Sequence, residues 1–291
     1  MLSFLKICWR TSGKFKFGVI VLTFFLVLAL TAPLIYRPII GDVTPARPGE
    51  FARWLPRSAT NPLGTDGHGR DLLTDYLAGL QTTLVIGFLA GIIASSVGII
   101  VGFLSAYKGG WIDSVLLTIT NMLIVIPSYP ILVAIAMVTP ELSVVSMSVI
   151  LALFSWPYSA RTIRAQVMTM KERPYVELAK VSGQGDWAII FTEILPNLTP
   201  YLLMGFAFSV VGAMVAEVGI EAIGLGPSNI ITLGLMINFA NGWGVYSMGR
   251  LEILLIPVSA LVLIFMAITM INRGMEEYLN PRLQKVTTEK E

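Results

Sequence analysis

Long runs of residues without Asp, Glu, Lys or Arg recur along the chain and alternate with shorter charged segments. A helix needs about 20 mostly apolar residues to cross about 30 Å of hydrocarbon, and it must be helical because unpaired backbone amides cannot face lipid. The runs that satisfy this length are residues 17–36, 84–106 (within the uncharged run 76–107), 114–140, 142–160, 194–216 and 253–272. The pattern therefore predicts an all-α integral membrane protein with six transmembrane helices.

A further uncharged run, residues 222–249, is rich in residues that weaken helices. It contains Pro227, Asn229, Asn238, Asn241 and glycines at positions 224, 226, 234, 242, 244 and 249. This composition argues against one continuous span and favours broken or re-entrant helices sheltered by the rest of the protein. In the third predicted span, Pro127 and Pro130 predict a kink.

Basic residues set the orientation of the spans. With six spans and a cytoplasmic N-terminus, most of the 20 Lys and Arg residues lie on the cytoplasmic side, as the positive-inside rule requires. The basic start and long apolar run of residues 1–32 favour an uncleaved signal anchor over a cleaved signal peptide. We expect three regions: residues 1–75 with the first helix and an extracytoplasmic segment, a transmembrane core at 76–275, and a cytoplasmic tail at 276–291.

Composition excludes several other classes of protein. Hydrophobic residues make up 55% of the chain and charged residues 13%, and the mean hydropathy is +0.76, which a soluble globule could not bury. A net charge of +2 leaves no basic face for a nucleic acid. The single cysteine, Cys8, has no partner for an internal disulfide. The single histidine, His68, lies in a turn-rich segment, where a turn capped by Asp66, Arg70 and Asp71 is favoured over a metal site.

The longest predicted cytoplasmic connection, residues 161–196, contains a short amphipathic segment. Pro174 suits the first turn of a helix, and Gly183 suits the position just after its end. The spacing of Tyr175, Leu178 and Ala179 predicts that they share one face. A helix of about nine residues is unstable alone in water. It therefore requires either the membrane surface or a docking partner.

At this segment the sequence resembles the permease subunits of binding-protein-dependent ABC importers. Their cytoplasmic loop carries a Glu-Ala-Ala motif, then a Gly, and later Ile-x-Leu-Pro or Leu-Pro. The matching positions here are Glu177, Leu178, Ala179, Gly183, Ile194, Leu195 and Pro196, with Leu178 in place of the usual Ala. Leu195 and Pro196 are expected to break the helix where the chain enters the membrane.

Other motifs extend the resemblance over nearly the whole chain, to the second permease of dipeptide, oligopeptide and nickel importers. They are residues 61–71, 106–110, 158–164, 217–226 (ending Gly224-Leu-Gly226) and 279–283. Departures also occur in or near the second and third spans. Asp75, Gln81 and Thr118 stand where this branch often has Arg, and Asn121 stands where it often has Asp.

The resemblance implies a type I importer permease fold with a cytoplasmic coupling helix, in the cell (inner or plasma) membrane of a prokaryote with both termini in the cytoplasm. It implies four kinds of protein partner or surface: a second homologous permease, two ABC ATPase subunits, an extracytoplasmic solute-binding protein and membrane lipid. This chain lacks the nucleotide-binding signature Gly-x-x-x-x-Gly-Lys-Ser/Thr. We therefore expect a non-catalytic subunit without cofactors, with ATP and Mg²⁺ on the ATPases.

Roles for individual residues follow from the same resemblance. Coupling to the ATPases is assigned to Pro174, Tyr175, Glu177, Leu178, Ala179 and Gly183. A structural role near the outer gate is favoured for Glu217, Glu221, Gly224 and Gly226, over a proton-coupled pathway. The pathway candidates are Asn121, Ser128 and Ser209, although close helix packing is the favoured explanation for most small residues of the second, third and fifth spans.

The expected solute is a dipeptide or oligopeptide, with an oligosaccharide or nickel as alternatives. Two other classes of function remain. A secondary transporter would require inverted repeats with paired broken helices, and only one broken segment is present. An intramembrane hydrolase would require paired catalytic groups within the spans, and no Asp lies within any of them.

Overall fold

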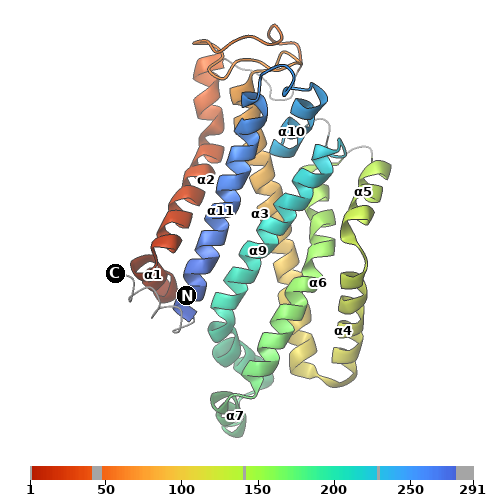
Figure 1. Cartoon of the computed structure of the whole chain (residues 1–291). Coiled ribbons are helices and arrows are strands. Elements are labelled where there is room, and N and C mark those ends of the chain that lie inside the picture. The colour runs from red at the N-terminus through yellow and green to blue at the C-terminus, as the bar shows by residue number, and fades with distance from the viewer. Residues whose placement is uncertain (1, 41–47, 140–141, 228–229, 280–291) are drawn as a thin grey trace.

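The computed structural model describes residues 2–40, 48–139, 142–227 and 230–279 (Figure 1). In this part of the chain, the secondary structure is helical apart from an isolated bridge between Thr65 and Asp71. The elements are α1 (Leu2–Thr11), α2 (Gly13–Ile40), α3 (Leu72–Lys108), α4 (Gly110–Val125), α5 (Ser128–Val138), α6 (Val144–Lys171), α7 (Pro174–Val181), α8 (Asp186–Ile189), the π-helix η1 (Ile190–Ile194), α9 (Leu195–Ala222), α10 (Leu233–Gly242) and α11 (Glu252–Leu279). The predicted all-α class is confirmed.

Helix α3 is the central element of the bundle. It packs against α2, α6 and α9, while α11 packs against α2 and α9, and α4 and α5 lie at the edge beyond α6 (Figure 1). The largest buried cluster joins α2, α3, α9, α10 and α11, and a second joins α3, α5, α6 and α9. Both clusters depend on α3, so its position determines that of the other long helices.

Glycines on α3 let neighbouring helices approach closely. A Cβ on Gly98 would lie 2.5 Å from Ser159 Cβ of α6, and a Cβ on Gly91 would lie 2.5 Å from Val210 Cγ2 of α9. Small residues allow such close approach of the backbones of membrane helices. Close packing matters there because the hydrophobic effect does not drive helices together within lipid. The expectation that small residues of the second span serve close packing is therefore correct for these positions.

Four helical segments are long and apolar enough to cross a membrane: 13–39, 72–108, 186–222 and 252–279. The pair α4 and α5 meets the same criteria as one unit, but it is bent by 77° at Ile126 and Pro127. The predicted kink is thus a break, because Pro127 has no N–H to continue the helix. Helix α6, which carries Arg161 and Arg164, covers the remaining predicted span without meeting these criteria. Its membrane crossing stays a prediction.

The two ends of the bundle are built differently. At one end lie α1, the end of α11 and α7; at the other lie residues 48–71 and α10 (Figure 1). Helix α1 is tied to α11, since the Ser12 hydroxyl donates to Glu277 Oε2 at 2.9 Å and Phe4 contacts Tyr278. The short α10 confirms that residues 222–249 do not form one continuous helix.

The segment before α3, residues 48–71, is a set of turns. Asp71 caps α3 by accepting from Thr74 N at 2.8 Å, and Asp66 accepts two hydrogen bonds from the Arg70 guanidinium. The predicted capped turn is confirmed. His68 packs against the rings of Phe239 and Trp243, and burial lowers its pKa, with Arg70 acting in the same direction.

We predict that Gly98→Ala destabilises the protein, because the added Cβ meets Ser159 Cβ and a tightly packed site must shift at a cost of about 1–3 kcal/mol. The measurement is thermal unfolding of the purified protein in detergent. Gly212→Ala is the matched control, since it is also a helical glycine and a Cβ there meets nothing within 4 Å. Equal melting temperatures for the two variants would contradict the packing role of Gly98.

Candidate coupling surface and translocation cavity

Helix α7 begins and ends as its sequence predicts. Pro174 occupies the first helical position, after Arg173 with extended backbone. At the other end Gly183 has φ +80°; its N–H donates to Lys180 O, and the N–H of Gln184 donates to Ala179 O at 3.1 Å. This pair of bonds is the Schellman motif, which favours glycine at the left-handed position. A Cβ on Gly183 would meet nothing within 4 Å, so backbone conformation is what requires glycine here.

The prediction that Tyr175, Leu178 and Ala179 share one docking face is wrong for Ala179. Ala179 and Val176 point inward and join a buried cluster with residues of α3, α6, α8, η1 and α9. Leu178 is 68% exposed and Tyr175 is 37% exposed. Val176 and Ala179 are three residues apart and share the buried face of the helix. Tyr175 and Leu178 have the same spacing and share the exposed face.

The outward side of α7 therefore presents apolar side chains to its surroundings. Val181 is 86% exposed, Leu178 lies one turn earlier, and Glu177 is also exposed beside them. We define these exposed residues, together with Tyr175, as the α7 tip. The tip is held by a buried base, in which Val176 and Ala179 pack with residues of the long helices.

The predicted break at Leu195 and Pro196 is wrong, because the chain stays helical from Asp186 to Ala222. A π-helix precedes the proline, in which Leu195 N donates to Ile190 O instead of the usual i−4 carbonyl. A π-turn adds one residue to the helical repeat. Pro196, which has no N–H to donate, follows this change of pitch without ending the helix.

Polar side chains join α3, α4 and α6 near α7. Arg164 donates from Nε to Asp113 Oδ1 and from Nη2 to Asp113 Oδ2, both at 2.6 Å, and Ser105 also donates to Asp113. Lys171, at the end of α6, donates to Ala106 O of α3 at 2.9 Å. These bonds fix the end of α6 that leads directly into α7.

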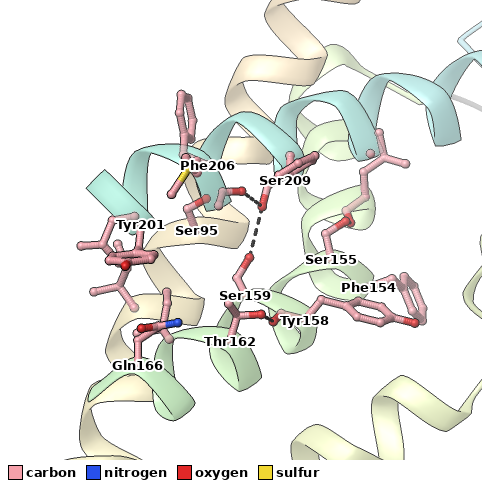
Figure 2. Close-up of a pocket in the computed structure, with 18 of the residues that line it drawn as sticks. Ser95, Phe154, Ser155, Tyr158, Ser159, Thr162, Gln166, Tyr201, Phe206 and Ser209 are labelled. Atoms are coloured by element: carbon pink, nitrogen blue, oxygen red, sulfur yellow. Dashed lines mark hydrogen bonds between the residues drawn. The ribbon is translucent and has the colours of Figure 1, made fainter. Parts of the chain in front are cut away.

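A cavity of about 500 Å³ lies between α3, α5, α6 and α9 (Figure 2). Ser159 of α6 and Ser209 of α9 point toward each other across it, with their hydroxyl oxygens 3.1 Å apart. Its lining is mainly apolar, with aliphatic and aromatic side chains such as Leu132, Leu151, Phe206 and Phe208. Polar side chains also line it: Ser95, Ser128, Ser155, Tyr158, Thr162, Gln166 and Tyr201, with Glu276 as a charged member.

Of the three pathway candidates, Ser128 and Ser209 line the cavity and Asn121 does not, since it is exposed on α4. Sequence reasoning missed the α6 wall. Ser155, Ser159, Thr162 and Gln166 follow a spacing of four, three and four residues, which places them on one helical face. That polar stripe on an otherwise apolar helix was a signal available in the sequence.

Small residues of α9 open this cavity rather than tighten a contact. A Cβ on Gly205 or Gly212 would meet nothing within 4 Å, and both glycines line the cavity. The expectation that small residues serve close packing is thus wrong for Gly212. The same residue type has opposite uses on α3 and α9.

Glu217, Glu221, Gly224 and Gly226 come together at the end of α9 remote from α7. Gly224 has φ +83° and ends α9 in a second Schellman motif, in which Leu225 N donates to Ile220 O at 3.1 Å. Glu217 and Glu221 are both buried, and a Cβ on Gly226 would lie 2.6 Å from Glu221 Cγ. These residues form one packed structural unit with α10.

The described residues thus form a bundle of apolar helices with a partly polar cavity and an exposed short helix at one end. The chain belongs to the family described as binding-protein-dependent transport system inner membrane component, whose model matches residues 98–285. It is therefore a non-catalytic permease subunit of a binding-protein-dependent ABC importer.

Relatives extend this similarity beyond the matched segment. The oligopeptide transport system permease protein OppC of Mycobacterium bovis is 32% identical over 225 residues, 75% of each chain. The protein of the same name from Lactococcus lactis subsp. cremoris is 33% identical over 186 residues, 64% of this chain and 63% of the relative. A relative from Brucella suis is 29% identical over 271 residues, 92% of this chain and 87% of its own.

A chain in a structure of the inward-facing MetNI methionine ABC transporter shares the fold. The TM-score is 0.52 and the identity 21%, covering 68% of this chain and 94% of that chain. The predicted type I importer permease fold is confirmed. Since the match covers only 68% of this chain, about a third of this chain lies outside the shared fold.

We predict that Arg164→Lys lowers the melting temperature of the protein, because an ammonium cannot form the bidentate contact with Asp113. A double-mutant cycle of Arg164→Gln and Asp113→Asn should give a coupling free energy of about 0.5–3 kcal/mol in thermal unfolding of the purified protein. Arg161→Gln, on the same helix at an exposed position, is the control. Additive effects of the two substitutions would show that the pair does not hold α4 to α6.

Proposed function

We propose that this chain forms half of the translocation pathway for an oligopeptide or dipeptide, in a prokaryotic cell membrane, and couples that pathway to cytoplasmic ATPases. Its partners are a second homologous permease, two ABC ATPase subunits that bind ATP and Mg²⁺, and an extracytoplasmic solute-binding protein. One observation carries the proposal: the segment that bears the α7 tip joins α6 to α9, the two helices that line the cavity and meet at Ser159 and Ser209.

Coupling follows from this connectivity. The α7 tip docks on an ATPase through Leu178 and Val181, whose exposed apolar surface is unfavourable in water. Closure of the ATPases on ATP moves α7 as a rigid body, and the buried base transmits that movement to α6 and to η1. Because α6 and α9 form opposite walls, their relative movement changes the width of the cavity.

Sidedness rests on the shared end of the molecule. The ends of α1 and α11 lie at the same end as α7 (Figure 1), and basic residues gather there, including Lys6, Arg10, Lys14 and Arg273. The positive-inside rule places this end in the cytoplasm. Both termini, α7 and the ATPases then lie on one side, and residues 48–71 face the solute-binding protein.

The peptide assignment rests on the named function of the OppC relatives and on the chemistry of the lining. Hydroxyl and amide groups pair with the backbone N–H and C=O groups of a peptide, and aromatic rings receive its side chains. The same lining also accepts a sugar, since hydroxyls and aromatic faces suit an oligosaccharide. Uptake by the importer complex in proteoliposomes, with its solute-binding protein, distinguishes a labelled peptide from a labelled oligosaccharide.

We predict that Leu178→Asp lowers the amount of ATPase that copurifies with the permease by on the order of tenfold, since an apolar interface anchor contributes at least 1–2 kcal/mol. The yield and the melting temperature of the permease alone should stay unchanged, because Leu178 is exposed. Leu178→Met, which keeps an apolar side chain of similar volume, is the control. Normal ATPase copurification with Leu178→Asp would refute docking through the tip.

A further inference from the structure

Two glutamates at the end of α9 are buried without a cationic partner. Glu217 is 0% exposed and Glu221 is 1% exposed, and neither forms an ion pair with the residues that the structure describes. A buried ionised carboxylate without compensation is costly. The two carboxyl groups therefore require another way of balancing their charge. The inference drawn from them does not depend on which solute the permease carries.

Space around the carboxyl groups is restricted by glycines. A Cβ on Gly226 would lie 2.6 Å from Glu221 Cγ, and a Cβ on Gly234 would lie 2.6 Å from Glu221 Oε2. The turn after α9, which contains Gly226, and the first turn of α10, which contains Gly234, thus pack directly against Glu221. This tight packing favours a very small occupant of the site.

The hydrogen bonds leave one oxygen of each carboxyl group unsatisfied. The Thr83 hydroxyl donates to Glu217 Oε1 at 3.1 Å and accepts from Leu233 N, while the Thr232 hydroxyl donates to Glu221 Oε2 and accepts from Leu235 N. Glu217 Oε2 and Glu221 Oε1 have no partner. The two residues are four positions apart on α9, so their carboxyl groups lie on the same helical face.

Ionised carboxylates accept hydrogen bonds and cannot donate, so two of them cannot satisfy each other. One proton removes both problems, because it supplies a donor for the two free oxygens and leaves a single negative charge. We infer that Glu217 and Glu221 hold one proton between them, carried by Glu217 and donated to Glu221.

The geometry of α10 explains why the charge belongs on Glu221. Thr232 is the N-cap of α10, and its hydroxyl donates to Glu221. The free N–H groups at a helix N-terminus favour a negative charge. Glu217, one turn earlier on α9, reaches the α10 N-terminus only through the Thr83 hydroxyl, which accepts from Leu233 N. Glu221 Oε2 lies directly against Gly234 in the first turn of α10. The shared proton thus becomes a structural link that joins α9 to the N-terminus of α10.

Infrared difference spectroscopy of the intact importer complex at neutral pH tests the inference. The wild-type complex should show the carbonyl stretch of one protonated carboxyl group, shifted by deuterium exchange, that is absent from Glu217→Gln. A wild-type spectrum without this band, or a band that survives in both Glu217→Gln and Glu221→Gln unchanged, would overturn it.

Stability supplies a second test that separates a proton from a bound cation. Glu217→Gln keeps a donor at the same place, so its melting temperature and uptake should stay close to the wild type. Glu217→Ala removes that donor and leaves Thr83 without its acceptor, so its melting temperature should fall clearly below that of Glu217→Gln. A wild-type melting temperature that rises with sodium or potassium chloride, but not with choline chloride, would overturn the proton in favour of a cation.

Discussion

The contact of α3 with α6 on one side and α9 on the other determines the rest of this structure. Gly91 and Gly98 allow both neighbours to approach the same helix at backbone distance. Because α6 and α9 are each held to α3 and not filled against each other along their length, a space remains between them. The cavity is thus a consequence of the close packing of α6 and α9 against α3.

This arrangement makes the loop between α6 and α9 mechanically important. Val176 and Ala179 bury the inner side of α7 among residues from both walls, and the Arg164–Asp113 pair ties α6 to α4 just above it. The continuous helix through η1 extends the same rigidity into α9. The apolar contacts around α7 thus join it to α6 and α9, the same helices that line the cavity.

The sequence predicted most of the helices, because runs of apolar residues without charge have one stable solution in a membrane. It also predicted both ends of α7 and the capped turn before α3, where Pro174, Gly183 and Asp71 act through local backbone chemistry. It did not predict the inward side of α7 or the continuity through Pro196. The inward side of α7 depends on neighbours distant in sequence. The continuity through Pro196 depends on a π-turn that the local sequence does not indicate. The cavity was predicted only at Ser128 and Ser209. The rest was missed because glycine and serine occur both at close helix contacts and in cavity walls, and their type alone does not distinguish the two.

Polar groups in this bundle are balanced by three different means along its length. Near α7 the Asp113 carboxylate meets a full guanidinium charge, where partial exposure makes an ion pair tolerable. In the middle, Ser159 and Ser209 pair as neutral hydroxyls, and no formal charge is needed. At the far end, Glu217 and Glu221 meet threonine hydroxyls and the N-terminus of α10, with full burial and no cation from the described residues. Ion pairing also occurs at this end, where buried Arg70 contacts Asp66 in the turn before α3, so burial alone does not exclude an ion pair. The Ser159–Ser209 pair presents neutral groups to the cavity, and Glu276 adds a charged group to the same lining.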